Sequence, residues 1–189
     1  MTTSTNPVSE LEKFKSKVFS SDLARPNRFN VEIPLPTLLS SRYKDTNETL
    51  NLFCEETNFP PLIVSTKAYR IFGPSYQLPT SVEFGGEGIS MSFHVDTEMK
   101  IKKIFEDWID IIVSLDNYTV TYAYDKNDNR NYLTDIKINQ LNAKDEIKYT
   151  CKLFEAFPRS MNVMPLNNSL QNQTHRLTVM FAYRYWKKS

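Results

Sequence analysis

The sequence predicts a mainly β (α+β) fold. Most segments between turn signals alternate apolar and polar residues, as in strands with one face on a core and one on water. One segment, about residues 98–114, has the wide apolar face of an amphipathic helix. A chain of 189 residues can bury a sizeable core but is short for two domains. We therefore expect one domain over 1–189.

The first element is a short N-terminal helix, about residues 8–21, within an arm that extends to residue 25. It contains no proline or glycine and has apolar residues at helical spacing: Val8, Leu11, Phe14 and Val18. Pro26 prevents continuation of the helix and favours an extended Arg25. From Phe29 the apolar period changes to two, which predicts a strand buried on one face.

A polar loop over residues 34–48 separates this strand from a second one. We predict a strand over 49–55, where Leu50, Leu52 and Cys54 alternate with other residues. A β-branched and aromatic run over 63–72 follows and ends at Gly73-Pro74. Since 80–84 can return antiparallel to it, we expect a long hairpin over 62–84 with a wide tip.

Three of the four glycines lie in the segment Gly85-Gly86-Glu87-Gly88. A turn and a phosphate-binding loop are the two interpretations. A phosphate loop needs a following helix whose free N–H groups point at the anion. An alternating strand over 89–95 follows instead, which favours the turn.

The predicted helix over 98–114 has one apolar and one charged face. Asp96 or Thr97 can cap its N-terminus. The simplest interpretation of the charged face is exposure to solvent, and the alternative is contact with a neighbouring subunit. The apolar residues at spacings of three, four and seven are Ile101, Ile104, Phe105, Trp108, Ile111, Ile112 and Leu115.

After the helix, residues 116–131 form a longer connection than the chain needs. Tyr118, Val120, Tyr122 and Tyr124 share one parity before a turn-rich stretch. Since long ordered excursions in compact domains tend to be functional, we expect a contact surface here. Strands follow near 132–140 and 146–154, with an interruption at Phe157-Pro158, a loop over 167–174 and a last strand over 177–185.

Composition excludes several classes of protein. A net charge of +1 gives no field for tight nucleic-acid binding. No apolar run reaches the length of a membrane span, and the N-terminus lacks the pattern of a signal peptide, so we expect a cytosolic protein without membrane insertion. Cys54 and Cys151 fit small core residues better than a disulfide or a zinc site. We expect no cofactor and no metal.

Candidate catalytic residues are few. Ser90, Ser92, His94 and Asp96 share one strand parity, so a Ser/His/Asp triad can be written. A triad, however, needs a base oriented between nucleophile and acid, usually from separate elements. We therefore predict that the protein is not an enzyme.

Three motifs occur in order along the chain. The first is D-L-A-R-P-N-R-F-N-V-E-I over 22–33. The second is the C-E-E-T-N-F-P strand exit over 54–60, and the third is the closing strand over 177–186 with its final Tyr-Trp. A Phe-x-Asp-Trp helix, over 105–108, lies between them. Together these segments resemble the tail tube proteins of contractile-tailed (myovirus-type) bacteriophages, whose opening signature the first motif matches.

The resemblance implies a structural virion protein with an antiparallel β-sandwich or partly rolled β-barrel. It implies homohexameric rings, closed into one continuous β-barrel and stacked into the tail tube, the conduit for genome delivery. Expected partners are other copies of itself, the tail sheath, baseplate and tail terminator proteins, and double-stranded DNA that passes without tight binding. The expected location is the virion tail, assembled in the host cytoplasm.

Long amphipathic strands would leave exposed edges in a monomer, and ring closure removes such edges. We expect assembly contacts at Arg25, Pro26, Asn27, Gly73, Pro74, Ser75, Tyr118, Tyr122 and Tyr124. We expect the hairpin to reach into the adjacent ring and the N-terminal helix to lie against a neighbouring subunit. A plain turn is the alternative for Arg25 to Asn27. A neutral to acidic lumen would let DNA slide; candidate lumen residues are Glu83, Ser90, Ser92, His94 and Asp96.

Two alternatives remain. Within the same class, the chain is a tube initiator, a terminator or a baseplate-associated ring protein of the same fold. From a different class, it is a cytosolic ligand-binding β-barrel or a small hydrolase that uses His94.

Overall fold

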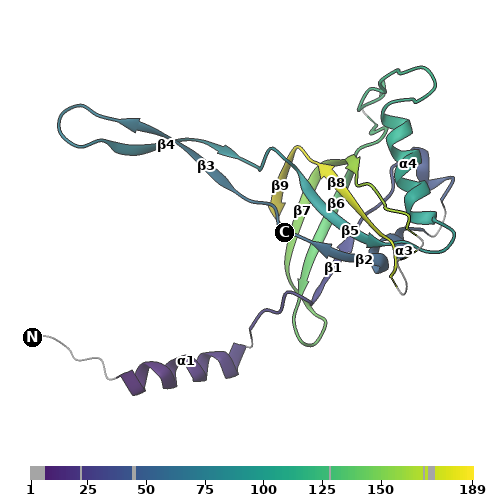
Figure 1. The fold of residues 1–189 in the computed structure, drawn as a ribbon. Coiled ribbons are helices and arrows are strands. Elements are labelled where there is room, and N and C mark those ends of the chain that lie inside the picture. Colours follow the sequence, from purple (N-terminus) through teal and green to yellow (C-terminus); the bar gives the residue numbers. More distant parts are fainter. Residues whose placement is uncertain (1–6, 22, 44–45, 128, 168, 170–172) are drawn as a thin grey trace, which may run out of the picture.

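A computed structural model describes residues 7–21, 23–43, 46–127, 129–167, 169 and 173–189. Residues 1–6 of the predicted arm, Asp22 of the motif, Asp128 and parts of the 167–174 loop lie outside the described residues. The elements are α1 (Pro7–Ser21), β1 (Phe29–Glu32), α2 (Thr37–Ser40), α3 (Thr46–Phe53), β2 (Cys54–Thr57), β3 (Ile63–Tyr69), β4 (Tyr76–Glu83), β5 (Ile89–His94), α4 (Lys100–Ile112), β6 (Thr134–Leu141), β7 (Ile147–Met161), β8 (Arg176–Ala182) and β9 (Tyr185–Lys188) (Figure 1).

The main sheet is antiparallel, with strand order β1-β6-β7-β8-β5-β2 and β9 paired with β7. The first half of β7 pairs with β6 and β9, and its second half pairs with β8. A strand that changes partners in this way forms a corner between two layers of a sandwich. The predicted mainly β, antiparallel fold is confirmed. The sheet is rolled but not closed, because β1 and β2 are the ends of the strand order.

The corner explains two wrong strand predictions. Phe157-Pro158 does not interrupt β7; it lies at the bend, where Pro158 pairs with Phe181 next to a register shift. Glu155, just before the bend, has a positive φ of 54°. The predicted last strand is divided at Tyr183 and Arg184, because β8 ends in one layer and β9 begins in the other. The Arg184 N–H donates to Phe154 O at 3.0 Å, which holds the chain where it crosses between the layers.

The predicted strand over 49–55 is also wrong. Residues 46–53 form α3, and only Cys54–Thr57 is a strand. In the helix Leu50 is fully buried, whereas Leu52, which the strand prediction placed on the same face, is 81% exposed. Asn51 Oδ1 accepts the Ile33 N–H at 3.0 Å, which fixes α3 to the end of β1.

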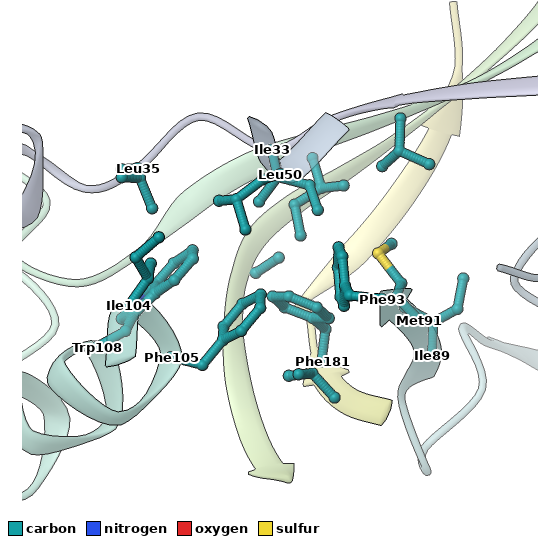
Figure 2. Close-up of a cluster of buried hydrophobic side chains, with 14 of the residues drawn as sticks. Ile33, Leu35, Leu50, Ile89, Met91, Phe93, Ile104, Phe105, Trp108 and Phe181 are labelled. Atoms are coloured by element: carbon teal, nitrogen blue, oxygen red, sulfur yellow. The ribbon is translucent and has the colours of Figure 1, made fainter. Parts of the chain in front are cut away.

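α4 covers the core, as the apolar spacing of its sequence predicted. Trp108 and Phe105 of α4 are fully buried with Phe93 and Phe181 of the sheet (Figure 2). The ring centroid of Phe105 lies 5.2 Å from that of Phe93 and 5.8 Å from that of Phe181. The Trp108 indole N–H donates a hydrogen bond to Tyr132 O at 2.9 Å. Such contacts combine a large buried apolar area with a satisfied polar group.

The start of α4 differs in detail from the prediction. Met99 precedes the helix in a left-handed conformation with φ 56°. Asp96 nevertheless accepts the Lys100 N–H at 2.8 Å. The predicted carboxylate therefore binds a free N–H of the first turn, although Asp96 stands three residues before the N-cap position, which Met99 occupies.

Both cysteine side chains are shielded from solvent. Cys151 is buried in β7, as predicted, and Cys54 is half-buried at the start of β2. Both thiols are free, and burial raises the pKa of Cys54 to about 12 and that of Cys151 to about 11. Both side chains are therefore protonated and unreactive at neutral pH.

The hairpin β3–β4 projects from the body of the subunit (Figure 1). It is a separate two-stranded sheet, connected in the chain to β2 before it and to β5 after it. Gly85-Gly86-Glu87-Gly88 joins β4 to β5 as a turn. At Gly88 (φ 90°) a Cβ would stand 2.3 Å from Phe181 O, so only glycine permits this close approach of backbones.

Candidate assembly interface

The hairpin leaves apolar side chains without cover from the rest of the described chain. Ile63, Val64, Tyr69, Tyr76, Leu78 and Val82 are all exposed. At the tip, Phe72 is 92% exposed and Ile71 is exposed beside it. The predicted tip residues Gly73, Pro74 and Ser75 follow directly, with Gly73 at φ 79°. A monomer gains almost nothing from such residues, whereas a partner surface can bury them.

α1 stands away from the sheet and covers none of it (Figure 1). Its residues Leu11, Phe14 and Phe19 are exposed, and Val18 is only partly buried. A helix of 15 residues is marginal in isolation, because most helix stability in proteins comes from packing of an apolar face. The apolar side chains of α1 therefore have no cover from its own sheet, and the contact of this helix with a neighbouring subunit stays a prediction.

The segment Arg25-Pro26-Asn27 forms a turn between α1 and β1. Its three residues are exposed, and the Arg28 N–H donates to Arg25 O at 3.1 Å. Gln140, which sequence reasoning missed, donates from Nε2 to Arg25 O at 2.8 Å and to Arg28 O at 2.7 Å. A lone glutamine on a strand gives no sequence signal for this role. The turn is therefore anchored to β6, and it directs the arm away from the body.

The loop after α4 exposes the predicted tyrosines. Tyr118 is 80% and Tyr122 85% exposed, whereas Tyr124 is only 37% exposed. Two isolated bridges, Val113 with Val120 and Tyr124 with Arg130, order the excursion. The loop extends from the end of α4, on the opposite side of the subunit from the hairpin (Figure 1).

The predicted lumen residues occupy two places. Glu83 is exposed near the base of the hairpin and accepts a hydrogen bond from Ser65. Ser90, Ser92 and His94 are half-buried on the outward face of β5, and Asp96 follows. Their partners do not form a triad: Ser92 Oγ lies 3.0 Å from Thr178 Oγ1, and His94 Nε2 lies 3.5 Å from Glu55 Oε2. Arg176 contacts the same carboxylate at 2.6 Å.

A second group of charges supports the corner in β7. Asp135 binds Arg130, Lys152 (3.0 Å) and the Glu155 N–H (3.2 Å), while Glu155 binds Arg184 at 3.1 Å. Burial alone would raise the pKa of Asp135, but the hydrogen bonds from Lys152, Glu155 and Arg130 lower it below its usual range. These contacts stabilise the fold around the bend and do not form a catalytic pair.

A pocket of about 370 Å³ lies at the root of the arm. It is largely apolar and bridges the two ends of the strand order, with residues of β1, β6 and the exit of β2. Thr57 Oγ1 is buried there without a hydrogen-bond partner. Sequence reasoning assigned no role to this pocket. Its lining is Ala24, Arg25, Pro26, Phe29, Thr57, Asn58, Phe59, Ile138 and Gln140.

Among the described residues, no cluster of three or more His, Cys, Asp or Glu side chains is arranged to hold a metal ion. No described helix has the length and apolarity needed to cross a membrane.

Comparison with solved structures identifies the fold. A chain of the anti-feeding prophage baseplate, in a six-fold symmetrised structure, superposes with a TM-score of 0.59 at 16% identity, over 89% of this chain and 97% of that chain. A chain of the PVC extracellular contractile injection system sheath–tube complex gives 0.59 at 16% identity (92% and 96%). A chain of the PVC sheath/tube terminator gives 0.57 at 18% identity (89% and 99%).

Comparison with protein sequences identifies the family. No match is found among curated proteins. The family model for phage tail tube protein, however, matches residues 24–189, which is most of the chain and begins just before the Arg25-Pro26-Asn27 turn. The chain therefore belongs to the phage tail tube protein family, and it is a structural protein of tail-tube type rather than an enzyme.

Proposed function

We propose that this protein is the subunit of hexameric rings that stack into the tail tube of a contractile-tailed phage, through which the genome is delivered. Family membership supports the tube role. The six-fold symmetrised baseplate with a chain of the same fold supports the ring size. Assembly would take place in the host cytoplasm, and the product would be part of the virion tail.

The hairpin is the observation that carries the proposal. Its two strands expose apolar side chains along their whole length, and no other described element of the subunit covers them. A surface that differs from the one it contacts makes a heterologous interface, which closes into rings or continues into filaments. A tube of stacked rings uses both kinds of contact, because one closes each ring and the other continues from ring to ring. In this proposal the hairpin and α1 make contacts between subunits and between rings.

The outward face of β5 is the proposed lining of the channel. DNA passes freely only if the lining offers few unopposed cations, because each one captures a phosphate. On this face Arg176 forms an ion pair with the carboxylate of Glu55, which His94 also contacts. The positive charge of Arg176 is thus opposed within each subunit, and sixfold repetition would not turn it into an unopposed basic ring.

The tyrosine loop, residues 116–131, is the proposed contact for other tail proteins. It is directed away from the hairpin, so it remains available when the hairpin is engaged. Exposed tyrosines are effective interface anchors because they bury a large area and retain a polar group. Structures with chains of the same fold include a sheath–tube complex, a baseplate and a terminator. Sheath, baseplate and terminator proteins are therefore the proposed partners.

Negative-stain electron microscopy of the purified protein tests the proposal. Long tubes support the major tube subunit, single rings favour an initiator or terminator role, and monomers that remain so at high concentration contradict both. A variant in which Asn-Gly replaces residues 69–76 removes the tip and retains the pair Ala68 and Gln77 as the end of the hairpin. We expect it to fold, as judged by circular dichroism, and to form no tubes.

The lining is tested separately. Glu83→Lys reverses a charge on the proposed lumen side, and Glu87→Lys makes the same change in the exposed turn before β5. In phage carrying each variant, the first should slow genome ejection and increase its dependence on salt. Equal rates of genome ejection for the two variants would contradict the placement of Glu83 in the lumen.

A further inference from the structure

The closing segment of the chain, Tyr183 to Trp186, lies where the hairpin leaves the body of the subunit (Figure 1). In the described structure the hairpin forms no ladder with the main sheet. Its direction therefore depends on the two legs that connect it to the body, residues 58–62 before β3 and residues 84–88 after β4. We propose that Tyr183, Tyr185 and Trp186 form a clamp that holds both legs, fixes the direction of the hairpin relative to the main sheet and presents it ready for assembly. The last step rests on the proposed tube function.

Each leg accepts a hydrogen bond from the closing segment. The Trp186 indole N–H donates to Pro61 O, in the first leg, at 3.2 Å. The Tyr183 hydroxyl donates to Phe84 O, in the second leg. Both acceptors are main-chain carbonyls, so the bonds restrain the path of the backbone rather than side chains that can rotate. Two donors from one short segment thus hold both legs at once.

The two legs also meet each other at the clamp. Gly85 has a φ of 72°, and a Cβ at this position would lie 2.8 Å from Pro61 Cγ and 3.2 Å from the Tyr183 hydroxyl oxygen. Only a residue without a side chain permits so close an approach. In the first leg, Pro60 and Pro61 each fix one backbone dihedral. The base of the hairpin is therefore a packed junction rather than a loose linker.

Aromatic rings connect this junction to the main sheet. The ring centroid of Phe84 lies 6.3 Å from that of Tyr185. Tyr185 stacks on Phe154, with 4.7 Å between centroids and 13° between the ring planes. Phe154 and Tyr185 are partners in the β7–β9 ladder, and β7 is the strand that joins the two layers. The clamp therefore attaches the hairpin to the strand that is tied to both layers.

A fixed direction favours assembly for an entropic reason. The apolar side chains of the hairpin are exposed, so they contribute binding energy only after a partner has covered them. An element that samples many directions loses that freedom when it binds, and an element already held in one direction loses less. With the clamp, the subunit orders the hairpin when it folds, before any partner arrives.

Distances between spin labels test the clamp in the folded subunit. Nitroxide labels at Ser75→Cys, in the tip, and Lys103→Cys, on α4, report the direction of the hairpin, because both positions are exposed and lie on different bodies. Burial raises the pKa values of Cys54 and Cys151, which keeps the native thiols slow to react with the label. Dilution with unlabelled wild type ensures that distances within one subunit dominate in double electron–electron resonance.

The double substitution Tyr183→Phe, Trp186→Phe removes both hydrogen bonds and retains an aromatic ring at each position. We expect one narrow distance distribution with the clamp intact and a clearly broader one in this variant. Tyr132→Phe is the matched control, because it removes an aromatic hydroxyl beside α4, away from both legs. A side chain that only stabilises the fold would lower the free energy of unfolding without broadening the distribution. Thermal melts followed by circular dichroism supply that comparison.

Assembly of the unlabelled variants gives a second measurement. The double substitution should raise the protein concentration needed for tubes by roughly tenfold, as the loss of one or two hydrogen bonds implies. Tyr132→Phe should leave this concentration unchanged. A distribution that stays narrow without the two hydrogen bonds, equal broadening in the control, or an unchanged assembly concentration would each overturn the inference. Failure of the wild type to form tubes would instead overturn the proposed function, while the spin-label distances would still decide whether the clamp holds the hairpin.

Discussion

The core under α4 and the hairpin β3–β4 are both rich in aromatic and β-branched residues, yet they differ completely in burial. In the core, Phe93, Phe105, Trp108 and Phe181 contact one another and are inaccessible to solvent. On the hairpin nearly every side chain is exposed. Apolar area stabilises only the state in which it is buried. The core therefore stabilises the subunit, whereas the apolar residues of the hairpin can stabilise only a state in which a partner covers them.

The largest loss of subunit stability should come from Trp108→Ala. The substitution leaves a cavity in the ring cluster and removes the hydrogen bond to Tyr132 O. We expect the free energy of unfolding to fall by about 3 to 5 kcal/mol. Urea denaturation of unassembled protein, followed by circular dichroism, measures it. A loss below about 1 kcal/mol would show that the comparison overstates the role of the core.

Gly88→Ala should give the next largest effect. Its Cβ would clash with Phe181 O at 2.3 Å, and alanine is strained at φ 90°. We expect a loss of roughly 1 to 3 kcal/mol. Gly86→Ala is the matched control, because a Cβ there meets nothing within 4 Å. Similar losses at both positions would mean that the turn, and not the contact with β8, determines the effect.

Asp135→Asn tests the charged support of the corner and should have a smaller effect. The side chain would lose its charge next to Lys152 and Arg130, at a cost of roughly 1 to 2 kcal/mol near neutral pH. The folded-state pKa of Asp135 is lowered, so its contribution is present above the unfolded value of about 3.9 and is lost as pH falls through the folded value. Stability curves of wild type and variant should therefore converge below about pH 4. Parallel curves down to acid pH would contradict this.

The smallest effect on subunit stability should come from the double substitution Ile71→Ser, Phe72→Ser. Both side chains are exposed, so the free energy of unfolding of the unassembled protein should change by no more than about 0.5 kcal/mol. Assembly, measured by sedimentation, should nevertheless be lost. If stability falls by as much as for Trp108→Ala, the tip belongs to the fold of the subunit and the comparison fails.

Sequence reasoning succeeded where one periodicity was long enough to dominate. α4 spans several helical turns with a continuous apolar face, and the hairpin has long strands on either side of Gly73-Pro74. It failed over residues 46–53, because Leu50, Leu52 and Cys54 are too few to distinguish alternation from a short helix. There the packing of Leu50 and the Asn51 bond to Ile33 determine the conformation.

The corner in β7 could not be predicted, because its causes are distant in sequence. Pro158 looks like a strand breaker, but its place beside β8 in a bend permits it. The tip, turn and loop residues could be proposed from the sequence because turns and unpaired aromatic residues have local signals, and their place at an interface stays a prediction. The pocket was missed because its lining comes from three separate segments, which only the fold brings together.

The connection of the hairpin to β2 and β5 also determines where a force on the hairpin enters the main sheet. Tension applied at the tip reaches that sheet through these two strands, which flank β3 and β4 in the chain. A pull along β5 loads the β5–β8 ladder, from Ile89 with Phe181 to His94 with Arg176, in shear. Hydrogen bonds loaded in shear share the force, whereas bonds opened across a strand pair break one after another. The β5–β8 ladder should therefore resist a pull along β5 better than a pull that peels β5 from β8.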